Sequence, residues 1–202
     1  MDATKKLAVL LSGNGTSLQN LIDRGFPIAC VVSSRPDAFG LDRARRAGIP
    51  AHVVERRGCP SREEFGARIL SLCESAGAGL ACMAGFLQLL PVPPAWAGRI
   101  MNIHPSLLPA FGGKGFHGLH VHEAALAAGV KVSGCTVHFA DEQYDQGPII
   151  VQRAVPVAED DTPESLQARV LAAEREAYPE AIALWQADRL RVEGRLVRIA
   201  PA

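Results

Sequence analysis

Short apolar runs that alternate with helical patterns set the fold of the first half of this chain. The run LAVLL at residues 7–11 is apolar throughout and stops at Ser-Gly-Asn-Gly, which is typical of a strand that is buried on both faces and ends in a tight turn. Further strands are predicted at 28–33, 49–54, 79–84 and 99–104, and helices at 16–24, 39–47 and 61–76. This order predicts an α/β fold with a doubly wound, mostly parallel sheet and a Rossmann-like N-terminal half.

The sequence of the second half of the chain predicts a different arrangement. It begins with a long loop at 105–118 that is rich in glycine and proline. A helix is expected at 119–128, followed by two strands at 131–139 and 148–155 that form an antiparallel or mixed extension of the sheet. A long helix should begin near residues 161–164, and 189–199 reads as a terminal hairpin. A chain of 202 residues fits one domain, 1–202.

The composition favours a protein that acts on small molecules. The 21 basic and 21 acidic residues cancel, so no global field would attract a nucleic acid or an anionic membrane. The five cysteines are scattered without a C-x-x-C pair, which indicates reduced thiols, and no segment is long and apolar enough for a signal peptide or a membrane span. We therefore expect a cytoplasmic protein that binds neither nucleic acid nor membrane.

The turn at residues 12–17, SGNGTS, ends the first strand and opens the first helix. Backbone N–H groups at a helix N-terminus, with the hydroxyls of Thr16 and Ser17 beside them, form a phosphate site. A P-loop lysine is missing, and Leu18 stands where a dinucleotide fingerprint has its third glycine, so a monophosphate is the expected ligand. The alternative is a glycine turn that only reverses the chain.

Asn102 and His104 lie two residues apart at the end of the fifth predicted strand. Strand geometry puts both side chains on one face, about 6 to 7 Å apart, where open α/β sheets hold their ligands. An amide is able to donate to an oxyanion, and an imidazole is able to transfer a proton in the same step. The alternative is a strand end with a hydrogen-bonded core histidine.

Acidic residues in the turn at 141–147 supply a possible third member of a catalytic set with Asn102 and His104. Asp145, brought beside His104, would orient and stabilise the imidazolium, although acids in turns are commonly only solvated. The histidines at 117, 120 and 122 have no cysteine or carboxylate at suitable spacing, so no metal is predicted.

Four segments resemble the phosphoribosylglycinamide formyltransferases (glycinamide ribonucleotide transformylases) of the folate-dependent formyltransferase superfamily. They are SGNGTSLQNLI at 12–22, AGFLQLLP at 84–91, NIHPSLLPAFGGKGFHGLHVHEAAL at 102–126 and GCTVHFADEQYDQGPIIVQ at 134–152. The resemblance implies transfer of the formyl group of 10-formyltetrahydrofolate to the amino group of glycinamide ribonucleotide in purine biosynthesis. With 202 residues we expect neither the extra C-terminal domain of methionyl-tRNA formyltransferases nor the extra N-terminal domain usual in formyltetrahydrofolate hydrolases.

The resemblance also implies roles for individual residues. Asn102, His104 and Asp145 would be catalytic: the amine attacks the formyl carbon, Asn102 and protonated His104 hold the oxyanion of the tetrahedral intermediate, and Asp145 supports His104. His138 would line the same pocket. The ribonucleotide would be bound by Gly15, Thr16, Ser17 and Glu174, and the folate by Arg62, Leu87, Gln88, Leu89, Leu90, Asn102, Asp141 and Asp145. Residues 6–104 would form the nucleotide-phosphate-binding half and 105–202 the folate-binding and catalytic half, in a monomer or a homodimer.

Two features depart from the family pattern. Many relatives carry Met-Arg where this chain has Leu87-Gln88, and the loop at 112–117 is longer than in the shortest relatives, as expected of a mobile lid. Two other functions are open at this point: a 10-formyltetrahydrofolate hydrolase with water as acceptor, and a noncatalytic nucleotide-binding protein. The missing third glycine disfavours a hydride-transfer enzyme.

Overall fold

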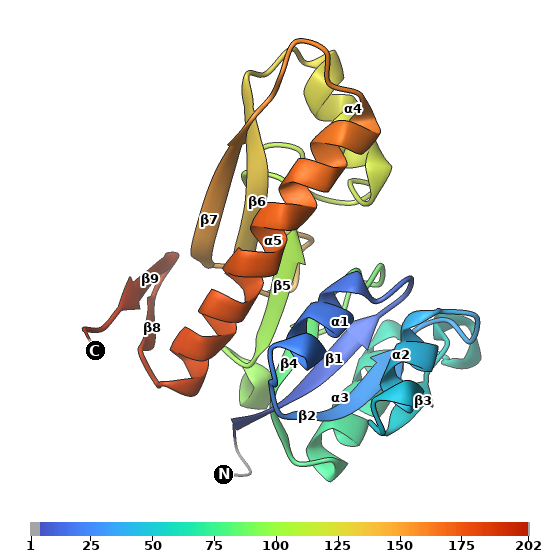
Figure 1. Ribbon diagram of the computed structural model, residues 1–202. Coiled ribbons are helices and arrows are strands. Elements are labelled where there is room, and N and C mark those ends of the chain that lie inside the picture. The colour runs from blue at the N-terminus through green and yellow to red at the C-terminus, as the bar shows by residue number, and fades with distance from the viewer. Residues whose placement is uncertain (1–4, 202) are drawn as a thin grey trace. The chain divides into compact units, whose positions relative to one another are not determined.

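The computed structural model describes residues 5–201 and divides into two compact units, at 5–101 and 102–201 (Figure 1). The first unit contains β1 (Lys6–Leu11), α1 (Thr16–Asp23), β2 (Ile28–Ser33), α2 (Gly40–Arg46), β3 (Ala51–Val53), η2 (Arg56–Gly58), α3 (Arg62–Ser75), β4 (Ala78–Met83) and η3 (Pro94–Trp96). β5 (Ile100–His104) begins in the first unit and ends in the second. The second unit continues with α4 (Leu119–Ala127), β6 (Val132–Phe139), β7 (Ile149–Pro156), α5 (Pro163–Gln186), β8 (Leu190–Glu193) and β9 (Leu196–Ile199).

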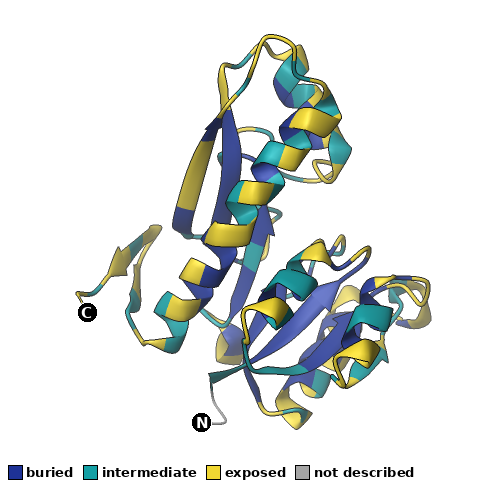
Figure 2. Cartoon of the chain, in the orientation of Figure 1, coloured by how far each residue is buried: buried dark blue, intermediate teal, exposed yellow. Residues whose placement is uncertain are grey.

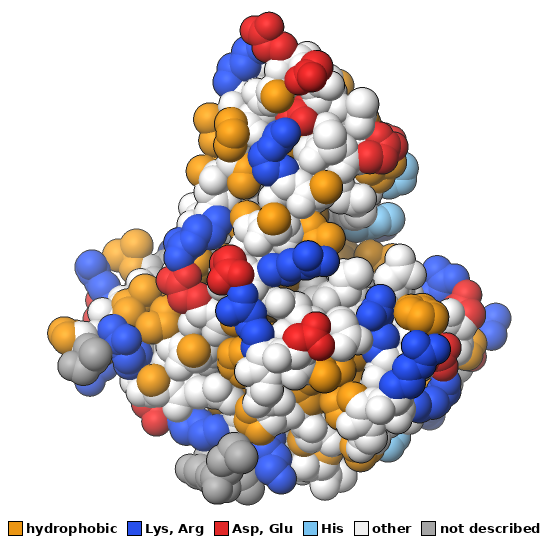
Figure 3. All heavy atoms as spheres, in the orientation of Figure 1, with side chains coloured by type: hydrophobic (Ala, Val, Ile, Leu, Met, Phe, Trp, Pro, Cys, Tyr) orange, Lys and Arg blue, Asp and Glu red, His pale blue; other side chains and the backbone are white. Residues whose placement is uncertain are grey.

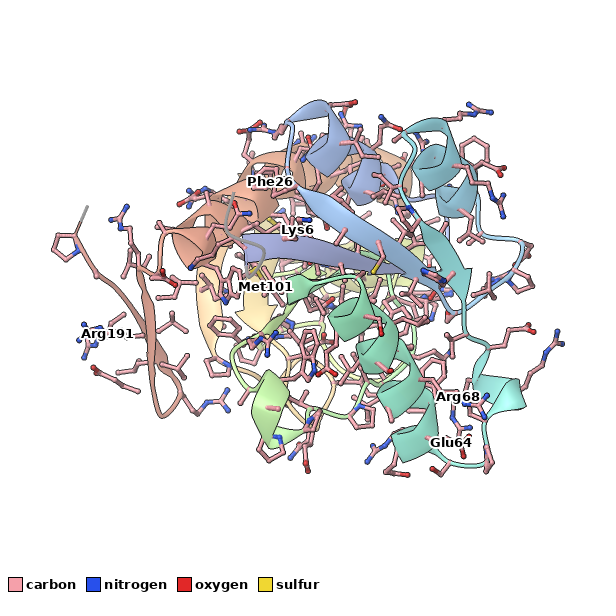
Figure 4. The ribbon with its side chains drawn as sticks, turned by 90° about the horizontal axis from the view of Figure 1, so that it is seen from below. Lys6, Phe26, Glu64, Arg68, Met101 and Arg191 are labelled. Carbon is pink, nitrogen blue, oxygen red and sulfur yellow. The ribbon has the colours of Figure 1, made fainter. Side chains whose placement is uncertain are left out.

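The first unit is built on a parallel sheet with the strand order β3-β2-β1-β4. From Leu7 to Leu11, β1 is fully buried, as its unbroken apolar sequence predicts (Figure 2). Helices α1 and α2 lie on one side of this sheet and α3 on the other (Figure 4). The doubly wound α/β fold is therefore confirmed.

Helix α3 begins after Ser61, in a sequence (Ser-Arg-Glu-Glu at 61–64) of the S-x-x-E form that is typical of helix starts. The Ser61 hydroxyl accepts a hydrogen bond from the Glu64 backbone N–H at 3.0 Å. The Glu64 carboxylate pairs with Arg68, one turn further along the helix (Figure 4). Ser61 thus caps the helix, while the Glu64 side chain forms an i,i+4 ion pair.

The second unit combines antiparallel strands with a long helix. β6 and β7 are antiparallel, as predicted, and α5 packs along both strands (Figure 1). A full capping box of Thr162 and Ser165 starts α5, and Leu166, Val170 and Ala177 bury its inner face. Ala173 and Leu184, which follow the same helical spacing, are only half-buried.

The terminal hairpin is confirmed as antiparallel β8 and β9, and β9 joins β7 in parallel at the pair Ile149 and Leu196. The predicted third strand shortens to Ala51–Val53, and the short helices η2 and η3 have no counterpart in the predicted pattern.

Acidic and basic side chains are interspersed on the face drawn in Figure 3. Within residues 5–201, none of the helices has the length and apolar character to cross a membrane.

Candidate functional site

Three of the predicted site residues lie together in the second unit: Asn102 and His104 at the end of β5, and Asp145 in the turn at 141–147. Asn102 is half-buried and His104 is 4% exposed. Nδ1 of His104 lies 3.5 Å from Oδ2 of Asp145, and Nδ2 of Asn102 lies 3.4 Å from Oδ1 of the same carboxylate. The turn at 141–147 therefore brings its acid between the amide and the imidazole instead of leaving it solvated.

The Asp145 carboxylate is held by backbone as well as side chains. Its own backbone is left-handed (φ 57°), and its Oδ2 accepts a hydrogen bond of 2.8 Å from the Gly113 N–H. Burial raises the pKa of Asp145, but the neighbouring His138 and His104 rings and the Gly113 N–H outweigh burial, so that its pKa lies below the ordinary value. Asp145 is thus ionised at neutral pH. The Gly113 contact is a backbone one that side-chain patterns do not reveal.

His104 has a protein partner at each ring nitrogen. Nε2 lies 2.9 Å from the carbonyl oxygen of Phe111, which only accepts, so Nε2 carries a proton. A second proton, on Nδ1, would face Asp145. Burial lowers the pKa of His104 by more than the Asp145 charge raises it, so the imidazolium is a stronger acid than an exposed one.

His138 is also buried, and it contacts Asn102 and Asp145. Its Nδ1 lies 2.8 Å from the Phe139 carbonyl oxygen and must therefore carry the proton of the neutral ring. Nε2 of the neutral ring then accepts a hydrogen bond from Asn102 Nδ2 at 3.1 Å. The second proton of a charged ring would point towards Asp145 Oδ1, 3.6 Å away.

The loop that follows β5 is fastened to β6 and β7. The buried Thr136 hydroxyl donates to the Ser106 carbonyl at 2.7 Å and accepts from the Leu108 N–H at 3.0 Å. Gln152 Nε2 donates to the Leu108 carbonyl at 3.0 Å. Ser106 Oγ donates to the Ala110 carbonyl at 2.6 Å, which orders the chain as it approaches Phe111. These bonds fix the loop segment whose carbonyl orients His104.

Gly147 closes the turn that carries Asp145, and we expect Gly147→Ala to destabilise the fold. A Cβ at this position would lie 1.8 Å from the Phe139 carbonyl oxygen, so the backbone has to move. Urea unfolding should show a loss of about 1–3 kcal/mol. Gly58→Ala is the matched control, because a Cβ at Gly58 meets nothing within 4 Å and its backbone, like that of Gly147, is not left-handed. Equal stability of Gly147→Ala and the parent protein would contradict the steric explanation.

The first unit contains the predicted phosphate turn. Gly15 is left-handed (φ 69°), and a Cβ there would lie 2.7 Å from Gly40 Cα, so only glycine allows α2 to approach the turn this closely. No side chain of the described residues caps α1, Thr16 is exposed, and Ser17 is half-buried. Arg43, which sequence reasoning missed, donates from Nε to the Asn14 carbonyl at 2.8 Å. The turn is therefore a rigid loop whose first helical N–H groups have no side-chain partner.

The segment predicted to bind folate lies beside this turn in the first unit. Ser12 N–H donates to the Gly85 carbonyl at 3.0 Å, and Ser12 Oγ accepts from the Leu87 N–H at 3.0 Å. The predicted folate residues of this unit differ in exposure: Leu87 is 41% exposed, Gln88 and Leu89 are half-buried, Leu90 is 1% exposed, and Arg62 is exposed. The Leu90 side chain belongs to the core, which leaves its backbone for any ligand.

Two more titratable groups lie in the second unit without a hydrogen-bond partner among the described residues. Glu174 on α5 is half-buried, and burial raises its pKa to about 7. His122 on α4 is 1% exposed, its Nδ1 is unsatisfied, and its pKa is lowered by burial and by His104. Sequence reasoning considered His122 only as a metal ligand. No group of three or more His, Cys, Asp or Glu side chains within 5–201 has a metal-binding arrangement.

Asp141, the remaining predicted folate residue, is half-buried at the start of the acidic turn. Its carboxylate accepts a hydrogen bond from the Gln143 N–H at 2.9 Å, which closes the turn locally. The roles that the sequence predicts for Asp141 and for the other site residues stay predictions.

Comparisons with known proteins find a matching family and similar solved structures. The sequence pattern of the formyl transferase family matches residues 5–182. Phosphoribosylglycinamide formyltransferase of Haemophilus influenzae is 38% identical over 95% of this chain and 92% of its own length. The crystal structure of glycinamide ribonucleotide transformylase 1 from Symbiobacterium toebii superposes with a TM-score of 0.90 at 46% identity, over 100% of this chain and 96% of that one.

Some relatives are much longer. The trifunctional purine biosynthetic protein adenosine-3 of Drosophila melanogaster is 45% identical over 89% of this chain, which spans only 14% of that protein. The matches to H. influenzae and S. toebii proteins, in contrast, extend over almost the whole of both partners. The chain belongs to the formyl transferase family and is similar to phosphoribosylglycinamide formyltransferases over almost its whole length.

Proposed function

We propose that the protein transfers the formyl group of 10-formyltetrahydrofolate to the amino group of glycinamide ribonucleotide, a step of de novo purine biosynthesis. The observation that carries the proposal is the Asp145 carboxylate, which is 10% exposed and contacts both Asn102 and His104. Relatives of nearly equal length that are named for this reaction support the choice of substrates. The folate is a co-substrate, and the reaction needs no metal.

Chemically, the neutral amine of the ribonucleotide attacks the formyl carbon, and the carbonyl oxygen becomes an oxyanion. His104 in its protonated form donates to this oxygen, which replaces the Phe111 carbonyl as acceptor of the Nε2 proton. Asp145 holds the imidazolium through Nδ1 and accepts the one proton that the amine nitrogen loses, directly or through water, and this proton passes on to the folate nitrogen. The C–N bond to the folate then breaks, and the folate nitrogen leaves with a proton.

The substrates would be bound by the residues that the family resemblance implies. The phosphate of the ribonucleotide lies at Gly15, Thr16 and Ser17, where the N-terminus of α1 has no side-chain cap. The carboxylate of Glu174 meets the glycinamide end. The folate meets Arg62, Asn102, Asp141, Asp145 and the segment 87–90. A cytoplasmic location and a monomeric or homodimeric state stay predictions.

The first experiment measures consumption of 10-formyltetrahydrofolate with and without glycinamide ribonucleotide. The proposal predicts that consumption depends on the ribonucleotide and yields one formylated ribonucleotide for each folate product. Turnover at the same rate without the amine would instead identify a hydrolase. Binding of the ribonucleotide without any turnover would identify a noncatalytic binding protein.

The phosphate turn is tested by the double substitution Thr16→Ala and Ser17→Ala. Removal of two hydroxyl donors is expected to raise the KM for the ribonucleotide about 10-fold or more, because each lost hydrogen bond to a charged group costs about 1.5–3 kcal/mol. The KM for the folate should change less than about threefold. Steady-state kinetics with each substrate varied in turn measure both effects. Equal increases in the two Michaelis constants would count against a phosphate site at this turn.

A further inference from the structure

Two successive peptide units of the phosphate turn are held by α2. The Gly13 carbonyl accepts a hydrogen bond of 3.1 Å from the Gly40 N–H, and the Asn14 carbonyl accepts one of 2.8 Å from Nε of Arg43. In a planar trans peptide the C=O and the N–H that follows it point in opposite directions. Because both carbonyls point towards α2, the N–H groups of Asn14 and Gly15 point away from it.

These two N–H groups have no hydrogen-bond partner within residues 5–201. They come directly before the first helical N–H groups of α1, which no side chain of the described residues caps. Gly15 is left-handed (φ 69°), and successive N–H groups beside a left-handed residue form a concave site for an anion. The orientation of this row of donors therefore depends on the bonds that α2 makes to the carbonyls behind it.

Arg43 is half-buried, and no carboxylate within residues 5–201 forms an ion pair with it. The neighbouring acid, Asp42, pairs with Arg45 instead. Nη1 of Arg43 donates to Oε1 of Gln19 at 3.1 Å, so the guanidinium is fixed to α1 as well as to the turn. A cation that donates to a carbonyl polarises the peptide and makes its N–H a stronger donor.

We infer that Arg43 is a positioning residue for the phosphate of the ribonucleotide. It holds the Asn14–Gly15 peptide with its N–H towards the phosphate, and its charge strengthens this N–H as a donor. The inference rests on the proposed function for the identity of the ribonucleotide. Both effects act on the phosphate end of the substrate, which does not change during formyl transfer, so they affect the KM for the ribonucleotide and not kcat.

Replacement of Arg43 separates this role from a general effect on the enzyme. Arg43→Met keeps an apolar stem but removes the donor and the charge, which should raise the KM for the ribonucleotide about 10-fold or more. The values of kcat and of the folate KM should stay within about threefold. Arg43→Lys restores a charged donor and should bring the ribonucleotide KM to within about threefold of the parent value.

Arg46→Met is the matched control. Arg46 lies on the same helix, and its Cζ is 5.8 Å from the centre of the Phe39 ring, compared with 5.1 Å for Cζ of Arg43. It forms no hydrogen bond with the turn within residues 5–201. The control thus removes the same charge and the same ring contact, and it should leave the ribonucleotide KM within about threefold.

Titration with ribose 5-phosphate tests the role of Arg43 without any turnover. The amide ¹H and ¹⁵N signals of Asn14 and Gly15 should shift when ribose 5-phosphate is added to the parent protein and should not shift with ribose. The Kd should be about 10-fold higher or more in Arg43→Met and within about threefold of the parent value in Arg43→Lys and Arg46→Met. The same spectra show whether each variant keeps the parent fold.

The inference would be overturned by an Arg43→Met protein that binds ribose 5-phosphate within threefold of the parent, or by equal weakening in Arg46→Met or in Arg43→Lys. Equal increases in both Michaelis constants of Arg43→Met, or Asn14 and Gly15 signals that do not respond in the parent protein, would also overturn it. A parent protein that binds ribose 5-phosphate at these amides but does not formylate the ribonucleotide would instead refute the proposed function and leave the role of Arg43 intact.

Discussion

Asp145→Asn is expected to lower kcat about 100- to 10,000-fold, the range that a general acid–base group supplies. The substitution removes the charge that faces Nδ1 of His104 and the acceptor that engages Asn102, while the side chain keeps its size. Asp145 is also one of the expected folate-binding residues, so the KM for the folate should rise as well, while the KM for the ribonucleotide should stay within about threefold. Steady-state kinetics with saturating folate and ribonucleotide measure the effect.

The pH dependence of the residual activity gives a second readout for Asp145→Asn. The Asp145 charge raises the pKa of His104 against the larger effect of burial, so its removal lowers that pKa further. If protonated His104 donates to the oxyanion, the decline of kcat towards alkaline pH should therefore begin at a lower pH in the variant.

Glu142→Gln is the matched control for Asp145→Asn. It neutralises an exposed acid in the same turn, three residues away, and should leave kcat within about twofold. Unfolding midpoints of both variants distinguish loss of function from loss of structure. A kcat of Asp145→Asn within threefold of the parent value would remove Asp145 from the catalytic set.

The part of the site that lies on regular structure follows from sequence. An apolar run that ends in Asn-Ile-His predicts a buried strand with Asn102 and His104 on one face, and the structure has both beside Asp145. The alternation of strands and helices predicts the doubly wound sheet of the first unit. These predictions succeed because they depend on side-chain period and local turn chemistry.

Contacts through the backbone and through distant residues do not follow from sequence patterns. The Phe111 carbonyl orients His104, and the Gly113 N–H holds Asp145, yet neither group has a side-chain signature. Arg43 joins the phosphate turn from another helix, and this pairing spans 29 residues. The third strand is shorter than predicted: Ala51–Val53 are in register with β2, while Pro50 and Val54 make one flanking backbone hydrogen bond each.

Leu90 shows a different limit of sequence reasoning. A family resemblance names the residues of a folate-binding segment, but it does not separate the side chains that contact ligand from those that hold the segment in place. Leu90 is buried in the core while Leu87 is exposed, so the two leucines of one short segment have different surroundings. Burial, which depends on the whole fold, makes this distinction.

Glu174→Gln is expected to stabilise the protein at alkaline pH, although Glu174 is proposed to bind substrate. Its pKa is raised from 4.5 in the unfolded chain to about 7 in the fold, because burial disfavours the carboxylate. Between these values the folded protein holds a proton that the unfolded chain releases, so stability falls as pH rises through this window. A shift of this size corresponds to about 3 kcal/mol at most, and the half-buried position reduces it to about 1–3 kcal/mol.

Urea unfolding at several pH values measures this effect. The stability difference between Glu174→Gln and the parent protein should be near zero at about pH 4.5, where the parent carboxyl is largely protonated in the fold, and should reach its full value above pH 7. Glu164→Gln, at an exposed position in the first turn of the same helix, should change stability by less than about 1 kcal/mol throughout. A pH-independent difference for Glu174→Gln would contradict the burial of an unpartnered carboxylate.

The same variant connects stability with function. A half-buried carboxylate without a hydrogen-bond partner in the described residues costs stability, and such costs are typical of binding and catalytic groups. If Glu174 meets the glycinamide end of the ribonucleotide, Glu174→Gln should raise the KM for the ribonucleotide about 10-fold while the folate KM is little changed. A variant that gains stability at pH 8 and loses no affinity would show that the buried acid serves another purpose than ribonucleotide binding.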